Sequence, residues 1–264
     1  MKAQIVITAD DVGASPTIDA AVLALLDLGT VTRAAAFSNA PGFASFVKRT
    51  KSRHSVVPHL TLTYGCPLGN PEPIKEMLAG TGNFKQPLDY FRGSVTDAIS
   101  SWFQSSYLRC DERAAALEIE RQLRHFSAAY GHSVGACTYH HDVDEMVLES
   151  NVRGAPSCFS RGRSGGWRAR RSAGAHYDLL DPRATVEDAI SSAITIIQAA
   201  INRSRSLGGL PAEAVFHPSE DSSDLGSFST YAEGRVLEYR ALQSPQVYEI
   251  LQTAVRVGDL LVFE

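Results

Sequence analysis

The sequence predicts an α/β fold, organised as an irregular TIM-like (β/α) barrel with mostly parallel strands. Short β-branched segments alternate along the chain with segments whose apolar residues recur at helical spacing, a pattern typical of parallel sheets covered by helices. The length of 264 residues suits one barrel of about 250 residues, and no repeat or linker divides it. We therefore expect residues 1–264 to form a single barrel-like domain.

The elements can be placed from local signals. Lys2–Thr8 is a β-branched run, and the helix after it begins at Ser15 and Pro16 and ends at Gly29. The clearest helix is Asp111–Ala129, which has an aspartate at its cap position and one apolar face. The other expected strands are 32–37, 55–63, 134–139, 213–216 and 260–263, and the other expected helices are a short one ending at Arg53, 185–203, 233–242 and 245–257.

Two stretches interrupt the alternation. Residues 65–93 are rich in Gly and Pro and have little periodicity, so we expect a loop that faces the substrate. Residues 151–174 contain six arginines interleaved with Gly and Ser and offer no apolar face. This composition predicts an irregular Arg/Gly/Ser-rich loop.

The composition disfavours several classes of protein. With 44% hydrophobic and 20% charged residues and a formal net charge of −4, the chain is typical of a soluble globular protein and a poor partner for nucleic acid. No apolar run reaches the roughly 18–20 residues that cross a bilayer, and the first residues lack the features of a secretion signal. We expect a cytoplasmic protein with no nucleic-acid or membrane partner.

Four polar clusters follow or end predicted strands, where parallel α/β folds bind their ligands. Asp10 and Asp11 are adjacent carboxylates after the first strand, and His59 lies in the third strand. His140 begins a run of His, Asp and Glu residues after the fourth strand, and His217 precedes a proline after a later one. Taken singly, each cluster also has a simpler interpretation, a solvated turn for the aspartates and a structural or surface role for the histidines.

Taken together, the clusters offer one carboxylate and two imidazoles, which are the donors of a facial metal triad with open positions for water and substrate. They leave a second carboxylate and another histidine. Hydrolysis of an amide needs a base for the attacking water and an acid for the departing amine. The sequence therefore indicates a metal-dependent hydrolase.

Five short motifs occur in order along the chain. They are Thr8-Ala9-Asp10-Asp11-Val12-Gly13 with Ser15-Pro16 and Gly29-Thr30-Val31-Thr32, His59-Leu60-Thr61-Leu62-Thr63 with Gly65 and Pro67-Leu68, the helix with Glu118, Glu120 and Gln122, His217-Pro218, and Arg235-Val236-Leu237-Glu238 before Leu242. In this order the chain resembles the YdjC-like carbohydrate deacetylases, the chitooligosaccharide deacetylase group.

The resemblance implies an irregular (β/α) barrel, one divalent ion, with zinc or magnesium expected, and hydrolysis of an N-acetyl group from an amino sugar. Carried over position by position, the metal ligands are Asp11, His59 and His140, the catalytic base is Asp10, and His217 is the candidate acid. The expected enzyme is a metal-dependent carbohydrate N-deacetylase acting on a linear amide, its partner is an N-acetylated sugar, and a homodimer is a reasonable assembly.

The chain departs from the family pattern at two places. The family motif Asp-Ser-His-x-His reads Thr138-Tyr139-His140-His141-Asp142 here, so the acid that often orients a ligating imidazole is absent at position 138 and Asp142 replaces the second histidine. We expect lowered metal affinity or altered sugar contacts, unless His141 or Asp144 compensates. The second departure is Arg153–Arg171, which is either a solvated loop or a site for an anionic substrate.

These departures keep two other functions open. A catalytically impaired carbohydrate-binding or regulatory protein on the same scaffold would bind sugar without releasing acetate. A metal-dependent phosphoesterase would use the arginines to pair with a phosphate.

Overall fold

The computed structural model describes residues 2–84, 112–131, 133–140, 157–158, 175–176, 180–181, 183–226, 229 and 231–264. Its strands are β1 (Ala3–Val12), β2 (Arg33–Ala36), β3 (Val56–Leu60), β4 (Ala136–Tyr139), β5 (Ser157–Cys158), β6 (Ala175–His176), β7 (Ala212–Phe216), β8 (Val255–Val257) and β9 (Leu260–Phe263). Its helices are α1 (Pro16–Leu28), α2 (Phe43–Thr50), the 3-10 helix η1 (Glu72–Met77), α4 (Glu112–Tyr130), α6 (Val186–Ser206), α7 (Ala232–Leu242) and α8 (Pro245–Gln252).

The strands form one curled, mixed sheet in the order β5-β4-β3-β2-β1-β7-β6. All neighbours along this path are parallel, which confirms the parallel pairing predicted for most strands. The exception is β9, which runs antiparallel to both β1 and β8. A closed TIM barrel is not confirmed, because the pairing of the described strands ends at β5 on one side and at β6 on the other.

Strand β1 is central because both of its edges are used. One edge pairs with β7 from Ile5 to Ala9. The other edge pairs with β9 near the amino end of β1 and with β2 from Thr8 onward. Every residue of β1 except Gln4 is buried, as expected for a strand that is covered on both faces.

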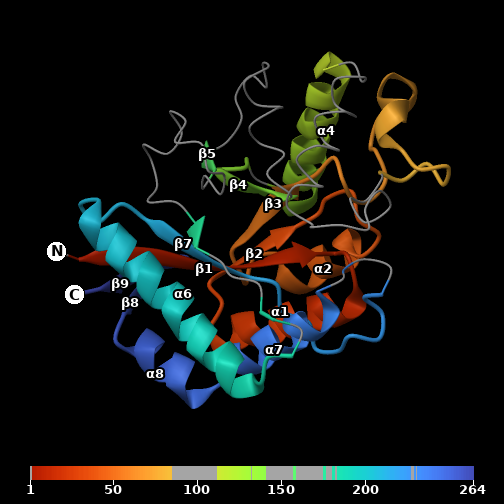
Figure 1. Ribbon diagram of the computed structural model, residues 1–264. Coiled ribbons are helices and arrows are strands. Elements are labelled where there is room, and N and C mark those ends of the chain that lie inside the picture. Colours follow the sequence, from red (N-terminus) through yellow and green to blue (C-terminus); the bar gives the residue numbers. More distant parts are fainter. Residues whose placement is uncertain are drawn as a thin grey trace.

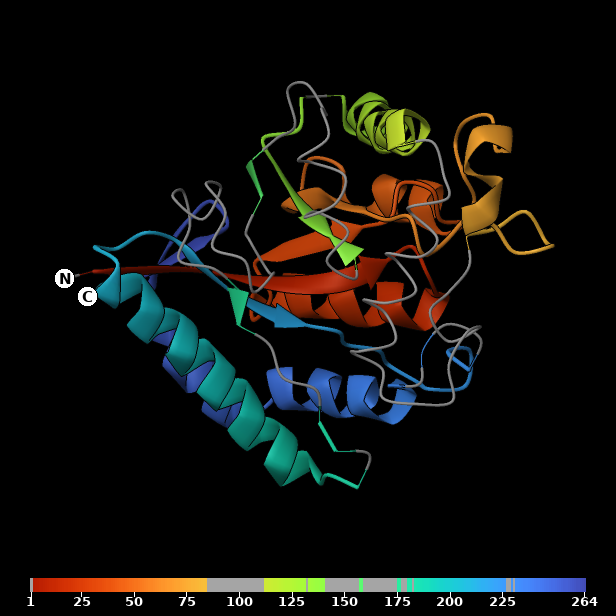
Figure 2. The ribbon, with the colours of Figure 1, turned by 45° about the horizontal axis from the view of Figure 1, so that its top comes forward.

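The helices cover the sheet on two sides. Figures 1 and 2 show α6, α7 and α8 together beside β1 and β7, whereas α4 lies beyond β3 and β4. Helix α1 begins where Ser15 accepts a hydrogen bond from the Thr17 amide (3.1 Å) and ends at Gly29 with φ 87°, as its sequence predicts. Helix α6 begins with a reciprocal capping box between Thr185 and Asp188.

Two hydrophobic clusters hold these layers together. The larger one packs β1, β2 and β7 against α1, α2, α4, α6, α7 and α8, with Phe46, Phe126 and Phe216 among its most buried side chains. The smaller one joins β3 and β4 to η1 and α4 through residues such as Leu60 and Met77. Both clusters include residues of β3 and α4, since Val56, Phe126 and Tyr130 belong to the larger one.

Three predicted segments differ from the structure. The helix predicted for 245–257 is too long, since α8 ends at Gln252 and residues 255–257 form β8. The predicted loop 65–93 contains η1 within its described part. Of the predicted loop 151–174, the structure describes the two residues of β5, and the rest lies outside the described residues, as do Asp111, His141, Asp142 and Asp144.

Within the described part of the chain, none of the helices combines the length and the apolar character needed to cross a membrane.

Candidate metal centre

The site is built on an irregular end of β1. The register between β1 and β2 shifts between Ala9 and Val12, and Asp11 has a left-handed backbone with φ 66°, a conformation that Asp tolerates better than most residues. This bulge presents two consecutive aspartates at the carboxyl end of the sheet. Asp10 is 1% exposed and Asp11 is fully buried.

Asp11 meets the two histidines that the sequence placed in the metal triad. Its Oδ1 atom lies 3.3 Å from His59 Nε2 and 3.2 Å from His140 Nδ1. One donor atom from each of the three residues lies within 4.8 Å of the others. Donors that share one ion at roughly 2.0–2.2 Å lie about 3 Å or more apart, so the spacing fits a divalent ion.

Two buried polar atoms of this cluster are placed as expected for ligands of a cation. Asp11 Oδ1 and His59 Nε2 are buried without a hydrogen bond of ordinary geometry, although buried polar atoms almost always have a partner. An imidazole nitrogen with its lone pair toward a carboxylate oxygen is repelled by it, and a cation between them removes that repulsion. The residues present therefore fit the metal that the sequence predicts.

Phe37 packs beneath both imidazoles. This buried ring lies 4.8 Å from the ring of His59 and 5.0 Å from that of His140, measured between centroids. A rigid aromatic wall restricts how far either imidazole can turn, which holds both rings toward Asp11.

Thr138 orients His59 at the ring nitrogen that lies away from Asp11. Its Oγ1 atom lies 2.7 Å from His59 Nδ1, and both residues are buried. In the tautomer that metal binding needs, Nδ1–H donates to this hydroxyl and Nε2 keeps its lone pair toward Asp11. A neutral hydroxyl thus occupies the position where the family pattern has an acid.

We expect Thr138→Val to weaken zinc binding about 10-fold, because valine keeps the shape but removes the acceptor that fixes the tautomer of His59. Isothermal titration with zinc measures the effect, and Thr195→Val, on the exposed face of α6, is the control. Equal affinity in the Thr138→Val and wild-type proteins would show that other contacts orient His59.

Arg235 of α7 holds the other oxygen of Asp11. Its Nη2 atom donates to Asp11 Oδ2 at 2.6 Å, and Arg235 is 4% exposed. Burial alone would raise the pKa of Asp11, but Arg235 and the nearby His140 and His59 outweigh it and hold this pKa well below its usual range. Burial also lowers the pKa of His140, despite the opposing charge of Asp11, which favours the neutral imidazole that binds metals.

Asp10 and His217 lie beside this cluster. Asp10 Oδ2 is 3.7 Å from His59 Nε2 and 4.0 Å from His217 Nε2. The side chain of His217 is 20% exposed, whereas that of Asp10 is 2% exposed. A buried carboxylate and a more accessible imidazole therefore face each other next to the three donor atoms.

Glu238, one turn after Arg235 on α7, holds the backbone of His217. The His217 amide donates to Glu238 Oε2, and the hydroxyl of Tyr231 donates to Glu238 Oε1 at 2.7 Å. Burial raises the pKa of Glu238 to about 7, against the lowering effect of the two hydrogen bonds and of Arg235. Helix α7 thus contacts both Asp11 and the segment that carries His217.

Helix α4 fixes the loop that follows His59. Gln122 pairs with the backbone of Thr61 in both directions, through Nε2 to the carbonyl (2.8 Å) and from the amide to Oε1 (3.1 Å). Glu118 accepts hydrogen bonds from the amides of Leu68 (2.9 Å) and Gly69 (3.0 Å). These contacts explain why two polar residues are buried on a helix face directed at the sheet.

Asp19 of α1 fixes the turn after Asp11, because its Oδ1 atom accepts a hydrogen bond from the Gly13 amide at 2.7 Å. Burial raises the pKa of Asp19 to about 6, more than this hydrogen bond and Arg49 lower it. A carboxyl whose pKa is raised by folding stabilises the protein fully below its unfolded pKa. That contribution is lost as the pH rises through the folded value.

Between about pH 4 and pH 6, the free energy of unfolding of the wild type should therefore fall by an amount of the order of 2 kcal/mol because of Asp19. We expect this fall to be absent in Asp19→Asn. The amide oxygen can still accept from Gly13, so the turn is kept. Urea unfolding at pH 4, 5, 6 and 7 measures the difference. Parallel stability curves for the two proteins would contradict a raised pKa of Asp19.

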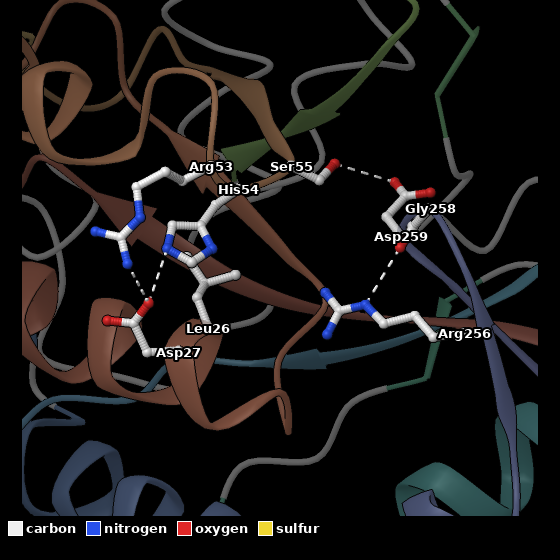
Figure 3. Close-up of a pocket in the computed structure, with 8 residues that line it drawn as sticks. All are labelled: Leu26, Asp27, Arg53, His54, Ser55, Arg256, Gly258 and Asp259. Carbon is white, nitrogen blue, oxygen red and sulfur yellow. Dashed lines mark hydrogen bonds and ion pairs between the residues drawn. The ribbon is translucent and has the colours of Figure 1, made fainter.

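A separate pocket lies away from these residues. Its volume is about 690 Å³. Figure 3 shows its lining, which comes from the end of α1, from residues 53–55 before β3, and from β8 and the turn to β9. Its charged groups all have partners, since Asp27 lies 3.1 Å from Arg53 and 3.0 Å from His54, Asp259 pairs with Arg33, and Arg256 donates to the Gly258 carbonyl at 3.2 Å. The candidate metal ligands, together with Asp10 and His217, lie instead at the carboxyl ends of the strands.

Comparison with known proteins gives the family of this chain. The family model of the YdjC-like proteins matches residues 4–253. The chain belongs to the YdjC-like family. No curated protein matches this YdjC-like chain.

Among solved structures, the YdjC-like fold is similar to a protein of Enterococcus faecalis V583 provisionally named a cellobiose-phosphate cleavage protein. The TM-score is 0.71 at 19% identity, over 94% of this chain and 93% of the other. A family 4 acetyl xylan esterase from Clostridium thermocellum, in complex with a cobalt ion, matches at a TM-score of 0.38 and 11% identity, over 81% of this chain and 73% of the other. A TM-score of that size is too low to support an argument.

The structure brings together all five residues that the sequence singled out, Asp10, Asp11, His59, His140 and His217. Their roles remain proposals. Arg235 and Glu238 had no predicted role, although both lie in a motif of the YdjC-like resemblance, and Thr138 was expected to lower metal affinity or alter sugar contacts. The signal available in the sequence was a pair of oppositely charged residues three positions apart. The structure places both on the buried face of α7.

Proposed function

We propose that this YdjC-like protein is a metal-dependent carbohydrate hydrolase that removes N-acetyl groups from amino sugars, such as chitooligosaccharides or conjugates that contain N-acetylglucosamine. The observation that carries the proposal is the cluster of Asp11, His59 and His140, with a buried carboxylate and an accessible imidazole beside it. Membership of the YdjC-like family supports a carbohydrate substrate.

Asp11 Oδ1, His59 Nε2 and His140 Nδ1 would hold the ion. One carboxylate and two imidazoles suit zinc, whereas magnesium prefers oxygen donors and would keep several waters. When bound, the ion would polarise the acetamide carbonyl and make the attacking water more acidic.

The remaining side chains would move the protons. Asp10 is held ready as the base that takes a proton from the attacking water, because it is buried, acceptor-only when ionised and adjacent to the donor cluster. His217 would give a proton to the nitrogen of the departing amine, since its ring is partly exposed and its backbone is fixed by Glu238. Phe37 and the loop held by α4 would limit access of bulk water from their side.

Acetate release from a panel of N-acetylated mono-, oligo- and conjugated sugars tests the proposal. The protein is first treated with a chelator and then supplied with zinc, magnesium, manganese or cobalt. We expect release only after an ion is returned. Phosphate release from sugar phosphates in a parallel panel, with inert acetamides, would replace the proposal by a phosphoesterase. Sugar binding without any release would replace it by a binding protein.

A further inference from the structure

We propose that Arg235 is a positioning residue that reserves one oxygen of Asp11, so that Asp11 offers a single oxygen to the ion and binds it less tightly than a free carboxylate would. This inference rests on the proposed metal site. It concerns how the affinity of that site is set, which neither the family nor the fold assigns.

The two oxygens of Asp11 are divided between two directions. Oδ1 lies 3.3 Å and 3.2 Å from the nitrogens of the two histidines, whereas Oδ2 accepts from Arg235 Nη2 at 2.6 Å. The short charge-assisted hydrogen bond directs Oδ2 to the guanidinium, whereas Oδ1 is the oxygen that lies beside both histidine nitrogens. The contact therefore makes Asp11 a one-oxygen ligand.

The guanidinium is held in place independently of the ion. Arg235 Nε donates to Ser229 Oγ at 3.3 Å, and the carbonyl of Arg235 accepts a hydrogen bond from the Ser219 amide at 3.1 Å. The position of Arg235 in α7 fixes the origin of its side chain. Arg235 therefore stays next to Asp11 whether or not a metal ion binds to Oδ1.

Burial gives the charge of Arg235 its effect. The side chain of Arg235 is 5% exposed and that of Asp11 is fully buried, so water screens the guanidinium weakly. Its positive charge would repel a metal ion in the same cluster. It also offsets part of the negative charge of Asp11 that would attract that ion. The charge of Arg235 would therefore lower the affinity of Asp11 for an ion, and an ion bound there would be neutralised less by Asp11.

Two variants at the same position separate charge from shape. Arg235→Gln keeps an N–H donor near Asp11 but removes the charge, and Arg235→Lys keeps the charge. Arg240→Gln changes the charge at an exposed position of the same helix and is the matched control. Zinc dissociation constants of the chelator-treated proteins are measured by isothermal titration, together with kcat and KM for an N-acetylated sugar from which the wild type releases acetate.

We expect Arg235→Gln to bind zinc about 10-fold more tightly than the wild type, with a lower kcat and little change in KM. Arg235→Lys is expected to bind zinc as the wild type does and to recover part of kcat, and Arg240→Gln to match the wild type in every constant.

Weaker or unchanged zinc binding in Arg235→Gln would overturn the proposal, which requires tighter binding once the charge is removed. Tighter binding could not be explained by damage to the site, because damage loosens a metal. Equal effects of Gln and Lys would overturn it as well, since the charge would then be irrelevant. If Arg235→Gln does not fold without an ion, the zinc concentration that protects each variant from urea gives the same comparison. A wild-type protein that binds no zinc would instead contradict the proposed function.

Discussion

Replacement of Asp10 by Asn is expected to slow acetate release about 1,000-fold or more while zinc still binds, because general-base catalysis contributes roughly 10²–10⁴ to such a reaction. Asparagine has nearly the same shape but cannot accept the proton of the attacking water. Asp10 Oδ2 stands 3.7 Å from His59 Nε2, and Asp10 is not one of the three residues of the compact donor group. The loss should therefore appear in kcat and not in the affinity for the metal.

Single-turnover kinetics and zinc titration of the same Asp10→Asn preparation separate the two roles. Asp181→Asn, which changes an exposed carboxylate, controls for the loss of one charge. If the Asp10→Asn protein loses zinc together with activity, Asp10 is a ligand and another group must act as the base. Full activity in that protein would remove Asp10 from the mechanism altogether.

The site could be predicted from the sequence to the extent that its signals are local. Asp10, Asp11, His59, His140 and His217 each lie in or directly after a strand of a parallel sheet. Parallel strands bring their carboxyl ends to one edge, so residues far apart in the chain meet there. No knowledge of loop conformation was needed for that step.

The residues that support the site could not be predicted in this way. Arg235 and Glu238 look like ordinary charges on a helix, and the sequence does not reveal that α7 turns this face toward β1. Thr138 looked like the loss of an acid. The paired register of His59 and Thr138 in β3 and β4 makes its hydroxyl the partner of the imidazole. Such partners follow from tertiary packing and not from local pattern.

The errors in the fold also have physical causes. Val255 and Val257 continue the apolar pattern of α8, but Gly258, with φ 64°, allows a tight turn and lets this segment pair with β9. Sheet pairing satisfies the backbone there although both valines remain largely exposed. Within the described residues the sheet ends at β5 and β6, two-residue strands without a local signal of their own.

Asp11→Asn is expected to abolish zinc binding at micromolar concentrations and to destabilise the metal-free protein by about 3 kcal/mol, since breaking a buried ion pair leaves an uncompensated charge. Asparagine tolerates the left-handed backbone at this position, where φ is 66°, so strain does not contribute. What changes is the partner of Arg235, whose guanidinium then meets a neutral amide at the oxygen it now contacts at 2.6 Å.

The pH dependence of this loss has a definite sign. Folding lowers the pKa of Asp11 well below its ordinary value of 3.8, so its contribution is present above that value and is lost as the pH falls through the folded pKa. Urea unfolding of the metal-free wild type and Asp11→Asn should therefore converge only below about pH 4. A cycle with Arg235→Met and the double variant Asp11→Asn/Arg235→Met measures the coupling, because the double variant no longer buries an unpaired charge. Strictly additive losses would mean that the contact between Asp11 and Arg235 contributes nothing to stability, and that the two residues are buried side by side for the sake of the metal alone.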